Sequence, residues 1–120
     1  LAFAAALVVP VFESSRKEAR IQDALLEAQT VYNAAGEYLM ETFHNRPMDN
    51  FEALDAFSSY DVTEQDSPLY PWLHDCQMEG GYISELYVNE QTGILEYLIY
   101  ETCDYTIRVN RDGSTKYRAY

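Results

Sequence analysis

The stretch that decides the fold is Leu1-Ala-Phe-Ala-Ala-Ala-Leu-Val-Val-Pro-Val-Phe12, which contains no charged residue. A bilayer-spanning helix takes about 20 apolar residues, so this run is too short to span a membrane alone. It passes without a turn signal into Glu13–Arg20, where three bases suit the rim of a membrane. Three interpretations compete: the end of a signal peptide, a short buried helix, and the outer half of a spanning helix.

After residue 20 the pattern of apolar residues becomes that of an amphipathic helix. Apolar residues recur at steps of three and four, which places them on one face; they are Ile21, Leu25, Ala28, Tyr32, Ala35, Leu39 and Phe43. The opposite face is predicted to carry polar residues: Asp23, Glu27, Asn33, Glu37 and Glu41. Asn45-Arg46-Pro47 is a stop signal. The sequence therefore predicts one helix over residues 1–46, with an apolar part at 1–12 and an amphipathic part at 13–46.

The next segment, 47–81, reads as an ordered connecting loop. Asn50 to Phe57 favours a helical turn or two, with Asn50 as its cap. Leu69, Trp72 and Leu73 are apolar enough to tether the loop to the core. The acids from Asp61 to Asp66 lack the glycine and the ligand spacing of an EF-hand, so we predict no metal site.

Residues 82–120 are predicted to form an antiparallel sheet of about four strands. The expected strands are rich in Tyr, Ile, Val and Thr; they cover 82–88, 94–101, 103–109 and 115–120. Glycine-containing turns separate the first from the second and the third from the fourth. Glu101-Thr102 leaves little room for a turn, so residues 94–109 have an alternative as one bent strand. Together with the helix this predicts an α+β class, with residues 47–120 and the 21–46 stripe in one globular domain.

The chain is acidic, and its charge is unevenly distributed. Its 20 acids and 8 bases give a formal net charge of −12, which argues against nucleic-acid binding. Residues 47–107 hold thirteen acids and no Lys or Arg. Residues 108–120 hold four bases against Asp112; the bases are Arg108, Arg111, Lys116 and Arg118. This asymmetry suits either an ordinary acidic surface or head-to-tail attraction between copies through the basic end.

No catalytic constellation is present in the sequence, and we expect neither an enzyme nor a cofactor. His44 and His74 do not have a metal-binding spacing, and the glycines form no phosphate-binding loop. Cys76 and Cys103 are predicted to form a disulfide if the body is extracellular, closing a loop of about 27 residues. The alternative is two free buried cysteines in a cytosolic protein.

The half-hydrophobic helix, the variable loop and the four-stranded sheet together resemble a type IV pilin or pseudopilin. The local support is Ala4 to Phe12, which is similar to the outer half of the pilin membrane helix, with its Ala-rich stretch, proline and aromatic residue. Arg16, Lys17, Arg20 and Leu25 suit its continuation. The glycine cleavage site, the following aromatic residue and the glutamate of the family motif are not in this sequence; they are expected upstream of Leu1.

The resemblance implies a structural subunit of a filament at the cell surface, anchored in the membrane before assembly and polymerised by helix packing. The expected assembly residues are Leu1, Phe3, Leu7, Val8, Pro10, Val11 and Phe12. The helix around Ala6 to Pro10 is expected to lose helicity in the filament. Expected partners are further copies of the chain, other pilins and the assembly machinery, and DNA only in an uptake filament. Two alternatives stay open: a pseudopilin or minor pilin of a secretion or DNA-uptake machine, and a membrane-anchored extracellular binding domain that does not polymerise.

Overall fold

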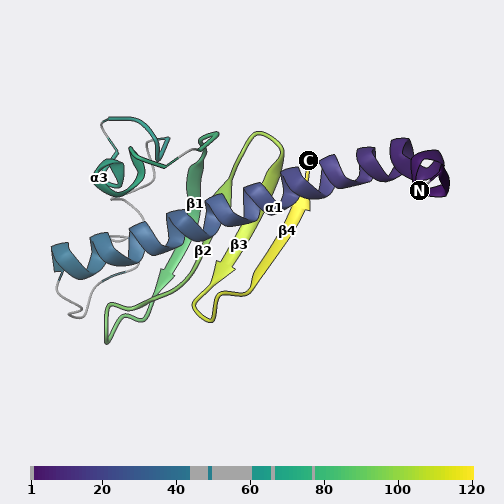
Figure 1. Ribbon diagram of the computed structural model, residues 1–120. Coiled ribbons are helices and arrows are strands. Elements are labelled where there is room, and N and C mark those ends of the chain that lie inside the picture. The colour runs from purple at the N-terminus through teal and green to yellow at the C-terminus, as the bar shows by residue number, and fades with distance from the viewer. Residues whose placement is uncertain (1, 44–48, 50–60, 66, 77) are drawn as a thin grey trace.

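The computed structural model of the chain describes residues 2–43, 49, 61–65, 67–76 and 78–120. Within the long helix, side chains are described from residue 18 to residue 42. One helix lies diagonally across one face of a four-stranded sheet (Figure 1). The α+β class predicted from the sequence is confirmed.

Helix α1 runs without interruption from Ala2 to Phe43. Its C-terminal half packs on the sheet, and its N-terminal end extends well beyond the sheet (Figure 1). The predicted apolar stripe is the contact face; the buried residues are Ala28, Val31, Ala34, Ala35 and Leu39. Pro10 lies inside the helix. The predicted stop signal at residues 45–47 lies outside the described residues.

The sheet is a meander in which every strand pairs antiparallel with its neighbour in sequence. The strands are β1 (Tyr82–Val88), β2 (Leu95–Glu101), β3 (Tyr105–Asn110) and β4 (Thr115–Ala119). These bounds agree with the predicted strands to within two residues. Gly113 has a φ of 89° in the β3–β4 turn, a conformation that favours glycine.

A tight turn separates β2 from β3, so the alternative of one bent strand over residues 94–109 is wrong. The Thr102 side chain makes this turn possible. Its Oγ1 accepts hydrogen bonds from the backbone N–H groups of Asp104 at 3.2 Å and Tyr105 at 3.0 Å. The hydroxyl thereby satisfies two donors that a three-residue connection would otherwise expose.

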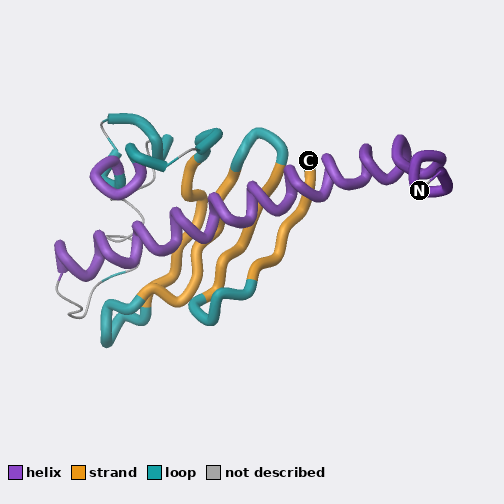
Figure 2. The backbone as a smooth tube through the Cα atoms, in the orientation of Figure 1, coloured by secondary structure: helices purple, strands orange, loops and turns teal. Residues whose placement is uncertain are grey.

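The core lies between α1 and the inner face of the sheet, the side that meets the helix (Figure 2). Leu98, Tyr100 and Ile107 are fully buried there. The short helix α3 (Tyr70–Leu73) closes one end of the core. Leu69 and Leu73 are buried, and the Trp72 ring meets Tyr38 of α1 edge to face at 6.1 Å, so the predicted tether is confirmed. The helical turn predicted over residues 50–57 lies outside the described residues.

Candidate functional site

The first candidate surface is the N-terminal end of α1. The predicted assembly residues from Phe3 to Phe12 lie in this part of the helix, which Figure 1 places beyond the sheet, whereas Leu1 lies outside the described residues. Within the described chain, no helix has an apolar stretch long enough to cross a bilayer. Their backbone continues the helix that packs on the sheet, so they lie on a part of α1 that projects from the domain (Figure 1).

The second candidate surface is the outer face of the sheet, which points away from α1. Side chains alternate between the two faces of a strand, and the register shows which residues share a face. Arg108 pairs with Lys116, and Thr106 pairs with Arg118. On β3 these two outward positions alternate with the buried Ile107 and Val109. Across the sheet, the outer face contains Glu85, Tyr87, Tyr97, Ile99, Glu101, Thr106, Arg108, Lys116 and Arg118.

The carboxylates of this outer face are held by hydroxyl groups. The Tyr97 hydroxyl donates to Glu85 at 3.2 Å, and the Tyr120 hydroxyl donates to Glu101 at 2.7 Å. Thr106 also donates to Glu101 at 3.2 Å. The pKa of Glu101 is lowered, chiefly by the Tyr120 hydrogen bond, so this carboxylate stays ionised.

Three of the four bases of the C-terminal region lie on the same face. Arg108 stands over the Tyr97 ring at 4.0 Å, and that ring stacks on Tyr87 at 5.7 Å. Lys116 and Arg118 are exposed, and neither forms an ion pair with a carboxylate of the described residues. The β3 and β4 side of the outer face is therefore a basic strip.

Arg111 does not belong to this strip. It lies in the β3–β4 turn, and its side chain forms an ion pair with Glu96 at 3.4 Å. Its backbone N–H donates to the Glu96 carbonyl at 2.8 Å. The electrostatic set predicted from the sequence is thus divided: Arg108, Lys116 and Arg118 face outward together, and Arg111 is engaged within the subunit.

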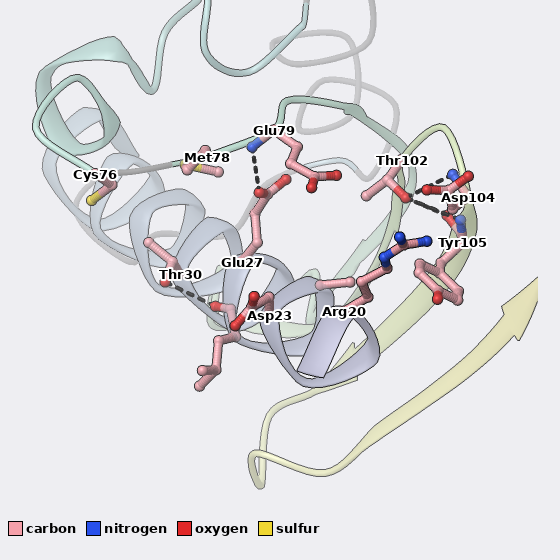
Figure 3. Close-up of a pocket in the computed structure, with 12 residues that line it drawn as sticks. Arg20, Asp23, Glu27, Thr30, Cys76, Met78, Glu79, Thr102, Asp104 and Tyr105 are labelled. Atoms are coloured by element: carbon pink, nitrogen blue, oxygen red, sulfur yellow. Dashed lines mark hydrogen bonds between the residues drawn. The ribbon is translucent and has the colours of Figure 1, made fainter. Parts of the chain in front are cut away.

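A hollow of about 560 Å³ opens between α1, the segment after α3 and the β2–β3 turn. Figure 3 shows Arg20, Asp23 and Glu27 on the helix wall, Cys76, Met78 and Glu79 on one side, and Thr102, Asp104 and Tyr105 opposite. Four carboxylates and one guanidinium line it, without a histidine.

Glu27, which lines the hollow, connects α1 to β2 and to the segment after α3 through two hydrogen bonds. One of its carboxylate oxygens accepts the Tyr100 hydroxyl at 2.6 Å, and the other accepts the Glu79 backbone N–H at 2.7 Å. Burial, followed by the bond to Glu27, raises the pKa of Tyr100 far above its ordinary value. The prediction placed Glu27 on the face opposite the apolar stripe, whereas it lies on the flank of the buried stripe, is half-buried and turns toward β2.

The predicted disulfide between Cys76 and Cys103 is not formed. Both thiols are free and exposed. Cys76 lies on one side of the hollow, and the turn that carries Cys103 between Thr102 and Asp104 lies opposite (Figure 3). A disulfide requires Cα atoms about 4.4–6.8 Å apart, and the hollow keeps these two segments separated. Of the alternative, two free buried cysteines, the structure shows the free thiols, but both are exposed and not buried.

The remaining candidates for chemistry are dispersed. The His74 Nδ1 lies 3.0 Å from the Tyr70 carbonyl, and its Nε2 lies 3.3 Å from the Asp75 carboxylate. Over the described part of the chain, no three His, Cys, Asp or Glu side chains are grouped to hold a metal ion. His44 lies outside the described residues.

No family model, no curated protein and no solved structure matches the chain.

Proposed function

We propose that this protein is a structural subunit of a type IV pilus-like filament. Its apolar helix end is held in the membrane before assembly and is buried against other copies in the filament. The domain formed by the second half of α1 and the sheet is displayed at the filament surface. Because the domain would be displayed on the filament, we also propose that the protein is located at the cell surface.

One observation carries the proposal: α1 continues as a helix past the edge of its own sheet (Figure 1). The projecting end includes residues 2–12, which contain no charge. An uncharged, apolar run is unfavourable in water, at roughly 25 cal/mol per Å² of apolar surface exposed. Such an end requires an apolar environment outside the domain, and a bilayer followed by a bundle of helices supplies it.

The burial of the α1 side chains described, from residue 18 to residue 42, supports the proposal that one part of the helix holds the domain. Residues 18–20 are exposed although they precede a well-packed half, whereas Ala28, Val31 and Ala35 are fully buried. Within the described side chains of α1, the buried contacts with the domain therefore begin at Ala28, and residues 18–20 face solvent.

The test uses the full gene product in cells that carry a pilus-assembly machine. Cell-surface material is sheared off, pelleted, viewed by electron microscopy and probed for the protein. The unmodified protein is expected in long filaments. Leu7→Arg places a charge in the apolar run and is expected to abolish them. Ser14→Arg, just past the run, is the matched control and is expected to leave filaments intact.

Three outcomes separate the candidate functions. Filaments built mainly of this protein support the proposal. Short or rare filaments that need another subunit indicate a minor pilin or pseudopilin. An unmodified protein that stays monomeric in the membrane fraction overturns the proposal and indicates an anchored domain that does not polymerise.

A further inference from the structure

Helix α1 has a second face that its own sheet does not cover. The exposed positions on it recur at steps of three and four, directly opposite the buried stripe. We call this the outer stripe; it comprises Gln22, Leu26, Asn33, Glu37, Met40 and Glu41, all exposed. Leu26 and Met40 are 59% and 49% exposed, and they lie on the same side as two carboxylates.

The outer face of the sheet has the complementary composition. Tyr87 is 45% exposed and, with Tyr97 and Ile99, provides an apolar centre on β1 and β2. The basic strip of Arg108, Lys116 and Arg118 borders this centre on β3 and β4. Glu85 and Glu101 also lie on this face, and tyrosine and threonine hydroxyls of the same subunit donate hydrogen bonds to them.

We propose that the outer stripe of α1 in one copy docks on the outer face of the sheet in the next copy. Met40 then covers the tyrosine centre, and Glu37 and Glu41, which lie within one turn of it on the helix, meet the basic strip. Each helix becomes enclosed between its own sheet and that of a neighbour. This inference rests on the proposed function in one respect: the contact would hold neighbouring subunits of the proposed filament side by side.

Charge complementarity selects a second copy as the occupant. The molecule carries a net charge of −12, so whole copies repel one another at long range, and the attraction is confined to the place where the three bases of the strip meet Glu37 and Glu41. The two faces differ and lie on opposite sides of one subunit, so the contact is heterologous. A heterologous contact that does not close into a ring propagates into an open chain of subunits.

The test is a charge-swap experiment on the full chain in mild detergent, which keeps the apolar helix ends apart. One variant reverses the basic strip (Lys116→Glu/Arg118→Glu), and the other reverses the stripe (Glu37→Lys/Glu41→Lys). A third, Glu64→Lys/Glu90→Lys, changes the net charge as the stripe variant does but at exposed positions elsewhere, and serves as the control. Self-association is measured by sedimentation at about 0.1 M salt, where a Debye length of about 10 Å screens the long-range repulsion between copies but not the contacting charges.

We expect each reversed variant alone to lose association by at least about tenfold, because like charges then face each other. An equal mixture of the two is expected to associate again, since each supplies the surface that the other lacks. The combined variant with all four reversals should also associate. The Glu64→Lys/Glu90→Lys control should behave as the unmodified protein.

A second readout locates the contact. Lys17 and Lys116 are the lysines of the chain, so zero-length carbodiimide cross-links have few possible origins. Cross-links from Lys116 to Glu37 or Glu41 between isotopically distinct copies are expected. Absence of rescue in the mixture, or cross-links from Lys116 only to other acids, overturns the inference. Filaments that persist in the strip variant while rescue fails would overturn this contact and leave the proposed function standing.

Discussion

At the residue scale, the contact between Tyr100 and Glu27 joins the sheet to the helix. The Tyr100 side chain is fully buried, and its hydroxyl donates to the Glu27 side-chain carboxyl group at 2.6 Å. Tyr100→Phe is therefore expected to lower the free energy of unfolding by about 1.5–3 kcal/mol, the range for hydrogen bonds to charged groups. Urea denaturation measures it. Tyr117→Phe, on an exposed ring of β4, is the control, and an equal loss in both variants would contradict the assignment.

The same pair gives a pH dependence. The pKa of Tyr100 in the folded protein is raised above its ordinary value of 10.0, mainly by burial and then by Glu27. Above pH 10 the unfolded chain releases this proton while the folded chain retains it, so unfolding becomes more favourable as pH rises. We expect the free energy of unfolding to fall above pH 10, and to fall less steeply in Tyr100→Phe. Parallel slopes in the two proteins would refute this.

Two glycines provide a matched comparison of close packing. A methyl group on Gly81 would overlap the Glu101 carbonyl oxygen and lie 2.9 Å from the Tyr100 ring, whereas one on Gly36 would meet nothing within 4 Å. Gly81→Ala is expected to destabilise the protein by about 1–3 kcal/mol through overpacking. Gly36→Ala, inside α1, is expected to stabilise it by about 0.5–1 kcal/mol through helix propensity. Thermal denaturation of both variants tests the contrast, and a stabilising Gly81→Ala would refute the packing.

At the element scale, α1 has two faces with different roles. Leu39 is 2% exposed on the buried stripe, and Leu26 is 59% exposed on the outer stripe. Leu39→Ala is expected to cost about 2–5 kcal/mol of stability because it leaves a cavity. Leu26→Ala should change stability by less than about 0.5 kcal/mol. Chemical denaturation measures both, and comparable losses would mean that the stripe is packed within the subunit.

The elements also show how far the sequence could predict the fold and the site. The helical stripe and the strands were predictable because burial imposes a period that is visible in the residues. The β2–β3 turn was ambiguous because one side chain, Thr102, replaces the glycine that usually marks a turn. The role of Glu27 was missed because a residue on the flank of a stripe can turn to either side. The ion pair of Arg111 with Glu96 and the absence of the disulfide depend on distances between segments that are far apart in the sequence. No local sequence pattern encodes these distances.

At the scale of the whole molecule, the shape is elongated because α1 extends beyond the sheet on which it packs (Figure 1). The chain extends 61 × 28 × 24 Å with a radius of gyration of 17.1 Å. A compact chain of this length would have a radius of gyration of about 14 Å. In detergent we expect trypsin to cut first near Arg16, Lys17 or Arg20, ahead of the sheet, and to leave a resistant domain. In filaments these sites should be protected. Initial cleavage at Arg108, inside β3, would contradict this.

The meander order of the sheet has a consequence for how the chain folds. Consecutive antiparallel strands can form by local hairpin closure, which costs little loop entropy. The helix meets the sheet only across long sequence separations, as in the bond from Tyr32 to the Leu95 carbonyl, 63 residues away. We therefore infer that the meander forms in the transition state and that α1 docks afterwards. On that route the helix, although synthesised first, is fixed last, and weakening its docking speeds unfolding more than it slows folding.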